Sequence, residues 1–351
     1  MNVAPRWLKA SWESNNVIPS RISARQGESD PGGETRSGRE RKRTLLVAKC
    51  NLIVDSCCDL PMEMVDRSGI YLIKYPYIIE GQQYFDDMFS SIAPREFYDR
   101  MRAGEFPSTA QIPLDDIQQA WTKAAESGVP TVYLSFSSGL TGTVDQAWRL
   151  MNETKQKYPD AELYLVDTLQ ACTAEAMLVY EALKQRDKGL TAHEMVEWAQ
   201  GASRHLNDQF MVDDLTALKK GGRIPPAAAS IAMKLDVKPM LTITLDGKLG
   251  LCGMARGRKK GIKQLLGYFT KRIPEGERDR TIFVGHADCP DDAERLVDML
   301  KKVAPGADIV ITNVGPVIGS HVGPGMISIV FFGPDRSNDE TLLGRFGKKK
   351  A

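Results

Sequence analysis

A strand-length apolar run that leads through a polar turn into an amphipathic helix most constrains how this chain can fold. The run from Val129 to Leu134 is bounded by Gly128, and the turn from Ser135 to Thr143 is rich in hydroxyl groups. The apolar residues after the turn recur at helical intervals, at Val144, Ala147, Trp148 and Met151. Because a helix start leaves backbone N–H groups unpaired at the positive end of its dipole, the turn predicts a site for a small acidic ligand.

Two other uses of the same turn stay open at the level of its residues. Serine and threonine often only cap a helix. The residues Ser135 to Gly139 also resemble the nucleophile elbow G-x-S-x-G, with serine in place of the first glycine.

Strands alternate with helices through the first half of the chain, and this alternation predicts a parallel sheet in an α/β/α three-layer arrangement. Pro76 predicts that the strand at 70–79 is bent or lies at an edge. Thr191 and Glu194 form a capping box for a helix that runs to about Leu206. Strands are predicted at 51–54, 70–79, 129–136 and 163–166, and helices at 62–68, 94–102, from Leu114, after Thr143 and after Thr191.

The second half predicts an α/β region with a mixed sheet. Asp246-Gly247 lies between two apolar runs and predicts a hairpin with a type I′ turn, hence an antiparallel strand pair. One or two helical turns are expected at 213–218, longer helices at 256–272 and 291–303, and strands at 281–284, 308–311 and 327–332. We therefore expect a disordered basic and polar extension at 1–47, domains at 48–206 and 207–336, and a basic tail at 337–351.

Composition excludes several classes of function. The net charge is only +1, so no global field attracts nucleic acid. Four histidines without an HExxH or paired Cys/His pattern predict no metal site and no cofactor. Six cysteines without CxxC spacing predict reduced thiols, and the sequence lacks both an apolar run of the ~18 residues that span a bilayer and a signal peptide. These features predict a cytoplasmic protein.

Six segments occur in the order found in one known family. They are Val54 to Pro61, Ser108 to Gln111, Ser137 to Thr143, Asp214 to Ile224, Lys238 to Leu241 and His321 to Gly325. Over roughly residues 51 to 333 the chain resembles the DegV family, bacterial fatty-acid-binding proteins that serve as acyl carriers for a fatty acid kinase.

The resemblance implies two α/β domains with one long-chain fatty acid buried between them. It implies that Thr109, either Ser137 or Ser138, and His321 hold the carboxylate. Hydroxyl and imidazole groups bind a carboxylate through hydrogen bonds without a fixed ion pair, which leaves it able to accept a phosphoryl group. The glycine and proline residues around His321 bring backbone close to it and favour a ligand over a structural histidine.

The resemblance also implies that Arg223 lies at the headgroup end and takes part in phosphoryl transfer with the kinase, a role that suits a planar cationic group. Taken alone, Gly221-Gly222 is an ordinary helix stop and Arg223 an ordinary surface residue. The loops expected to support the site contribute Asp55, Ser56, Gly142, Thr143, Gly221, Gly222, Gly323 and Gly325.

The chain departs from the family pattern at four positions, which are Ala110, Thr141, Thr168 and Pro225. Only Ala110 removes a hydroxyl group near the expected headgroup, so it affects how many hydrogen bonds the carboxylate receives. Cys57 and Cys58 replace small residues and are interpreted as packing variants.

The sequence thus predicts a carrier that is not an enzyme by itself and that binds no nucleic acid. It would present the carboxylate of a fatty acid to an ATP-dependent kinase, with no stable membrane insertion but room for transient membrane contact during lipid exchange. The alternative is a serine acyl hydrolase that uses Ser137 or Ser138 with His321. A third hypothesis is nucleic-acid binding through the basic tails. Chain length and saturation cannot be predicted, because the apolar residues of the cavity wall are scattered over both halves.

Overall fold

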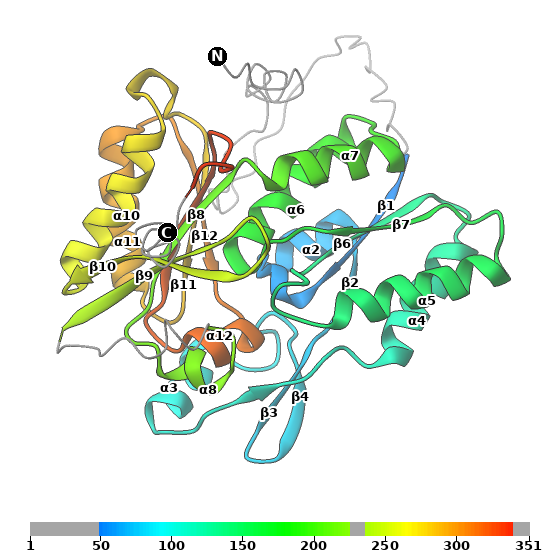
Figure 1. Ribbon diagram of the computed structural model, residues 1–351, viewed down its shortest axis with the longest axis horizontal. Coiled ribbons are helices and arrows are strands. Elements are labelled where there is room, and N and C mark those ends of the chain that lie inside the picture. Colours follow the sequence, from blue (N-terminus) through cyan, green and yellow to red (C-terminus); the bar gives the residue numbers. More distant parts are fainter. Residues whose placement is uncertain (1–48, 225–235, 340–351) are drawn as a thin grey trace, which may run out of the picture. The chain divides into compact units, whose positions relative to one another are not determined.

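A computed structural model of the protein describes residues 49–224 and 236–339, which belong to one compact unit. The predicted extension at 1–47, Pro225 and most of the predicted basic tail lie outside the described residues. Figure 1 shows a parallel sheet flanked by helices and a separate, larger mixed sheet. Both predicted sheet types, and with them the α/β fold class, are confirmed.

The first sheet contains four parallel strands in the order β2-β1-β6-β7. The strands are β1 (Asn51–Asp55), β2 (Tyr71–Ile73), β6 (Thr131–Ser135) and β7 (Leu163–Asp167). All residues of β6 are buried, as expected for a parallel strand covered on both faces. The helices around the sheet are α2 (Met62–Ser68), α4 (Leu114–Glu126), α5 (Thr143–Lys157), α6 (Cys172–Asp187) and α7 (Ala192–Ser203). In Figure 1, α4 and α5 lie together on one side of the sheet, opposite α6 and α7.

The second sheet has six strands in the order β10-β9-β8-β13-β11-β12. Only the pair β11 and β12 is parallel, and the other neighbours are antiparallel. The strands are β8 (Leu206–Met211), β9 (Val237–Ile243), β10 (Leu249–Arg256), β11 (Thr281–His286), β12 (Asp308–Asn313) and β13 (Ile327–Phe332). Helices α10 (Arg258–Arg272) and α11 (Pro290–Val303) cover one face and bury a core centred on Phe269, Leu296 and Phe331.

A third, three-stranded sheet corrects the prediction of one strand at 70–79. The chain divides before Pro76, so that β2 joins the parallel sheet while β3 (Pro76–Ile79) pairs with β4 (Gln82–Phe85) and β5 (Ser108–Thr109). Proline lacks the N–H that a ladder needs, so it is placed at the first residue of β3. The segment at 106–113 therefore contains a short strand, which carries Thr109.

The hairpin between β9 and β10 is confirmed, but its predicted turn type is wrong. Gly247 has a φ of 74°, whereas Asp246 is not among the residues with positive φ, so the turn is not type I′. The Gly247 N–H donates to the Thr244 carbonyl at 2.9 Å, and the Thr244 N–H donates to the Lys248 carbonyl at 2.7 Å. This is a three-residue loop that ends in a left-handed glycine.

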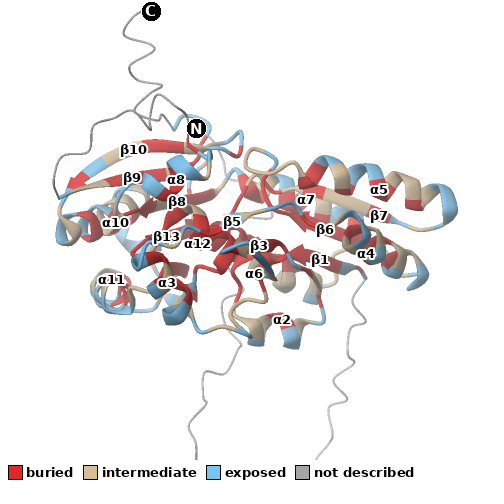
Figure 2. Ribbon diagram, turned by 90° about the horizontal axis from the view of Figure 1, so that it is seen from below, coloured by how far each residue is buried: buried red, intermediate tan, exposed pale blue. Residues whose placement is uncertain are grey.

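Helix α6 was not predicted, and its environment explains why. Ten of its sixteen residues are buried, and it contacts β8, β11 and β13 of the mixed sheet as well as the 3-10 turn η1 (Ser56–Cys58) of the first half. A helix covered on several sides has no polar face and hence no clear helical period. Figure 2 shows that buried residues concentrate in the strands of both sheets and between them.

Other elements agree with the sequence or refine it. The capping box of α7 is confirmed, but α7 ends at Ser203, and β8 follows in a segment where no strand was predicted. The domain boundary predicted between residues 206 and 207 falls at the start of β8 and stays a prediction. The remaining helices are α3 (Pro94–Arg102), α8 (Thr216–Lys220), the 3-10 turn η2 (Glu275–Glu277) and α12 (Pro316–Val322).

Glu175 on α6 is a buried acid without a partner. It is fully buried, and neither carboxyl oxygen has a hydrogen-bond partner. Burial, followed by the charges of Asp55, Asp59 and Asp167, raises its pKa well above the ordinary value. The folded state therefore holds this proton at a pH where the unfolded chain releases it.

We predict that Glu175→Gln makes the protein more stable than the wild type at pH 8 and equally stable near pH 4. A carboxyl group whose pKa is raised by folding stabilises the fold at low pH. As the pH rises from the pKa of the unfolded state to that of the folded state, this stability is lost at about 1.4 kcal/mol per pH unit. Urea denaturation from pH 4 to pH 8 measures the difference, with the exposed Glu63→Gln of α2 as the control. A difference that does not grow with pH would contradict the protonated assignment.

Candidate functional site

A cavity lies between residues of the first half and one face of the mixed sheet. Tyr75, Phe136 and Ala174 line it from the first half, and Phe210 and Val330 line it from the mixed sheet. The lining is mostly apolar, and its polar or ionisable members are Tyr75, Thr109, Gln111, Thr141, Cys172, Thr173, Asp208, Arg223, His321 and Ser328. Ligand pockets are typically apolar with a few placed polar groups.

Thr109 and His321, both predicted site residues, meet at this cavity. The Thr109 Oγ1 atom lies 2.8 Å from His321 Nε2, within hydrogen-bond distance. Thr109 comes from β5, which pairs with β3, and His321 lies in the last turn of α12. The glycine-rich segment at 315–326 contains this short helix, which turns the imidazole toward the first half.

His321 is partly buried, and its ring is neutral near pH 7. Burial lowers its pKa to about 4, and the nearby positive charge of Arg223 acts in the same direction. The Nδ1 atom is buried without a hydrogen-bond partner. A neutral imidazole carries one N–H donor and one acceptor, so this ring can supply one hydrogen bond to an oxyanion.

Gly221 makes room for this ring. A Cβ atom at Gly221 would lie 2.1 Å from His321 Nδ1, so no larger residue fits without a shift. The next residue, Gly222, has a φ of 68°, in the left-handed region that glycine adopts readily. The two glycines therefore serve different purposes, the first for close approach and the second for the turn.

Arg223 follows this turn and marks an opening of the cavity. It is exposed and also lines the cavity, and its Nη1 donates to the Gly221 carbonyl at 2.6 Å. A cationic group therefore lies near the partly buried imidazole at a place that another molecule can reach.

Ser137 and Ser138 do not line the cavity. The buried Ser137 Oγ donates to the Gly247 carbonyl at 2.8 Å and accepts from the Gly139 N–H at 3.1 Å. Ser138 is exposed, and its backbone N–H donates to Asp167 Oδ1 at 3.1 Å. The structure therefore groups Thr109, Arg223 and His321 around the cavity, without the two serines.

The two serines do not line the cavity because the tip of the β9–β10 hairpin packs on the Ser137-Ser138-Gly139 turn. A Cβ atom at Gly139 would lie 2.5 Å from the Gly247 carbonyl oxygen, so backbone meets backbone here. The Ser137 hydroxyl is directed to a carbonyl and not to the imidazole, which gives no support to the hydrolase alternative. Thr141 and Gly142 of the same turn do line the cavity.

Asp55 and Ser56 support the site from the end of β1. The buried Asp55 carboxylate accepts from the Phe136 N–H at 2.9 Å, the Tyr133 hydroxyl at 2.9 Å and the Cys57 N–H at 3.1 Å. Burial raises its pKa to about 6, although these hydrogen bonds act against the shift. Ser56 Oγ accepts from the Tyr75 N–H at 3.0 Å, and Tyr75 lines the cavity.

Glycines also shape the two other loops that the sequence predicted to support the site. A Cβ atom at Gly142 would lie 2.6 Å from Gln111 Nε2, and the N–H of the adjacent Thr143 donates to Thr141 Oγ1 at 3.2 Å. Gly323 and Gly325 have φ values of 75° and 84°, so both lie in the left-handed region.

Two acids that the sequence analysis missed hold the start of α12. Asp59 Oδ1 accepts from the Gly315 N–H at 2.9 Å, and Asp86 Oδ2 accepts from the Val317 N–H at 3.1 Å. Both carboxyl groups are buried, and burial raises the pKa of Asp86 to about 7 and that of Asp59 well above its ordinary value. Nothing in their spacing could have shown the contact, because more than two hundred residues separate the partners.

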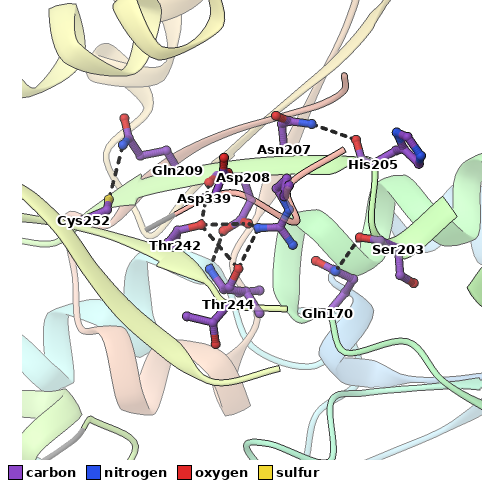
Figure 3. Close-up of polar contacts among 12 residues, drawn as sticks. Gln170, Ser203, His205, Asn207, Asp208, Gln209, Thr242, Thr244, Cys252 and Asp339 are labelled. Carbon is purple, nitrogen blue, oxygen red and sulfur yellow. Dashed lines mark hydrogen bonds and ion pairs between the residues drawn. The ribbon is translucent and has the colours of Figure 1, made fainter. Parts of the chain in front are cut away.

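A second polar cluster, also missed, lies around Asp208 on β8 (Figure 3). Arg336 Nη1 donates to Asp208 Oδ1 at 2.8 Å, and the Ile243 N–H donates to Oδ2 at 2.8 Å. Asp208 also lines the cavity. No local pattern pointed to this cluster, because 128 residues separate Asp208 from Arg336 and 35 separate it from Ile243.

Residues 49–224 and 236–339 contain no group of three or more His, Cys, Asp or Glu side chains arranged to hold a metal ion. Within the same ranges, no helix is long and apolar enough to cross a membrane.

Known proteins resemble this chain in sequence and in fold. A DegV domain-containing protein of Clostridium perfringens is 37% identical over 282 residues, which cover 80% of this chain and 97% of that protein. A solved DegV family protein from Thermus thermophilus, described by its fatty acid binding, is 27% identical with a TM-score of 0.70 and covers 82% of this chain and 100% of its own. Similar structures at this identity are described as binding proteins, in agreement with the prediction that the chain is not an enzyme by itself.

The Streptococcus pneumoniae Fatty Acid Kinase (Fak) B3 protein, solved with linoleic acid, has the same fold with a TM-score of 0.70 at 20% identity. It covers 81% of this chain and 99% of its own. The family model described as "Uncharacterised protein, DegV family" matches residues 49–333. The chain therefore belongs to the DegV family.

Proposed function

We propose that this protein is a cytoplasmic carrier that binds one long-chain fatty acid in the cavity and presents its carboxylate to an ATP-dependent fatty acid kinase. The observation that carries the proposal is the Thr109–His321 pair, 2.8 Å apart, at the wall of a largely apolar cavity. The fatty acid ligands described for similar DegV structures support the choice of ligand. The name of the S. pneumoniae relative supports the choice of partner.

The chemistry of the site suits a stored carboxylate. The Thr109 hydroxyl and the neutral His321 ring share one hydrogen bond, and when a carboxylate replaces this bond each can donate to it without neutralising its charge. The oxygen atoms thus keep the electron density that attack on a phosphoryl group needs. In this proposal Ser137 and Ser138 act through the turn that they build, with Thr141 and Gly142 as its members at the cavity.

Arg223 is assigned to the second part of the proposal, the transfer of a phosphoryl group to the carboxylate. Phosphoryl transfer places negative charge on the transferred group, and a cationic side chain aimed at that group lowers the barrier. Arg223 is exposed beside the imidazole, and its guanidinium is available to a second molecule. We therefore assign it to the encounter with the kinase and not to retention of the fatty acid.

We predict that freshly purified protein carries fatty acid. A sixteen-carbon chain offers on the order of 12 kcal/mol of apolar burial at ~0.8 kcal/mol per CH₂, before the cost of ordering, which is enough for retention. Mass spectrometry of an organic extract tests this prediction. An extract free of acyl chains, from protein that also takes up neither added palmitate nor oleate, would refute the carrier function.

We predict that Thr109→Ala and His321→Ala each weaken fatty acid binding about ten- to a hundred-fold. Each removes a hydrogen bond to a charged acceptor, worth roughly 1.5–3 kcal/mol. Titration with a fluorescent fatty acid measures the affinity, and thermal unfolding shows whether the variants fold. Ser108→Ala, an exposed neighbour on β5, is the matched control and should bind as the wild type does. Full affinity in both test variants would mean that the headgroup binds elsewhere.

We predict that Arg223→Ala retains fatty acid binding but loses most acyl phosphate formation with a cognate kinase, ATP and Mg²⁺. Arg223→Lys should restore little, because lysine lacks the planar fork of five donors. Lys219→Ala, which removes an exposed charge from the adjacent α8, controls for a general loss of positive charge. Equal losses of binding and turnover in Arg223→Ala would place Arg223 in the lipid site instead.

A further inference from the structure

The wall of the cavity on the mixed sheet runs along the strands and away from His321. Met326, just before β13, and Ser328 and Val330 on β13 line the cavity in succession. Met326 lies closest in sequence to His321, and Val330 is four residues further on, or ~13 Å at the rise of a β-strand. Val330 pairs with Asp208 on β8, so Asp208 lies at the end of the wall that is far from the imidazole.

The side chain of Asp208 faces this wall from a fixed position. Asp208 and Phe210 both line the cavity, as expected for alternate residues of one strand, whereas Gln209 between them bonds to Cys252. Asp208 is 3% exposed, and its partner Arg336 is 2% exposed. Figure 3 shows how the network around Asp208 joins β8 to Thr242 on β9.

Hydrogen bonds hold the Asp208 carboxylate in place, so it cannot easily move aside for an apolar group. Oδ1 accepts from Thr242 Oγ1 at 3.1 Å and from Arg336 Nη1 at 2.8 Å, and Oδ2 accepts from the Ile243 N–H at 2.8 Å. Arg336 Nη1 also donates to the Ile243 carbonyl at 2.7 Å, while its Nε and Nη2 atoms are buried without partners. Separating a buried pair leaves an uncompensated charge, which is strongly destabilising.

We infer that Asp208, held by Arg336, ends the apolar part of the cavity and sets the greatest acyl chain length that the protein accepts. This inference rests on the proposed function, because it concerns the tail of the same fatty acid. A terminal methyl group that reached Asp208 would have to displace a hydrogen-bonded carboxylate, which apolar contact does not replace. The end wall is therefore polar and its carboxylate is held by hydrogen bonds, so it acts as a stop.

The test replaces the pair by apolar residues of smaller or similar size in Asp208→Val/Arg336→Met. Removing both partners avoids an unpaired charge, a change that buried ion pairs often tolerate. The space released should admit longer chains. Each further CH₂ that is buried adds about four-fold in affinity, so a chain two carbons beyond the wild-type optimum should gain about fourteen-fold relative to the optimal chain.

Competition binding with saturated fatty acids from twelve to twenty carbons measures the preferred length in each variant. Val330→Phe, which enlarges the residue opposite Asp208 and keeps the ion pair, should move the preference to shorter chains. This variant keeps the inference testable if the double variant fails to fold. Gln209→Leu, on the opposite face of β8, is the matched control and should leave the preferred length unchanged.

The outcomes separate this inference from the proposed function. Wild-type protein that binds none of these fatty acids refutes the proposed function itself. Wild-type binding with the same preferred length in the folded double variant and in Val330→Phe overturns only the stop at Asp208. Tighter wild-type binding of 16-hydroxyhexadecanoate than of palmitate also overturns the stop, because Asp208 would then recognise a polar chain end.

Discussion

The start of α12 is held by two buried carboxyl groups from the first half of the chain, and the candidate site depends on this attachment. Asp59 and Asp86 accept the N–H groups of Gly315 and Val317 at 2.9 and 3.1 Å. These bonds satisfy amides that a helix start leaves unpaired. They also fix the helix whose last turn carries His321, so that the imidazole meets Thr109 on β5. A candidate site built from two halves needs such an attachment, since neither half holds both residues.

Burial then determines the chemistry of both ends of the cavity. At one end, desolvation keeps His321 neutral, so the ring serves as a hydrogen-bond partner and not as a counter-ion. At the other end, burial raises the pKa of Asp208, while the charge of Arg336 and the hydrogen bonds from Ile243 and Thr242 act against this shift. Apolar residues such as Phe210 and Val330 line the wall between these ends. An uncharged hydrogen-bonding pair from β5 and α12 thus lies at one end, and an ion pair that includes Asp208 of the mixed sheet lies at the other.

Sequence reasoning succeeded where a pattern is local. The strand-turn-helix unit at 129–151, the capping box of α7 and the β9–β10 hairpin each follow from neighbouring residues, and each is present. It failed where tertiary contacts decide, as for α6, which is covered on several sides, and for the strand that divides at Pro76. Within the site, motifs identified Thr109, Arg223 and His321 as cavity residues, but they could not show that the β9–β10 hairpin occupies the Ser137 hydroxyl.

The pairing of β8 with β13 has a consequence for how the protein is made. Met211 pairs with Ile327, and the strands between them in sequence complete the sheet on both sides of this pair. Contacts between residues so distant in the chain form slowly, because a large loop must close first. The chain up to Val330 must therefore leave the ribosome before the wall formed by Asp208, Phe210 and Val330 exists. Until then the apolar surfaces that face the cavity stay open to water, and they cannot enclose an apolar ligand.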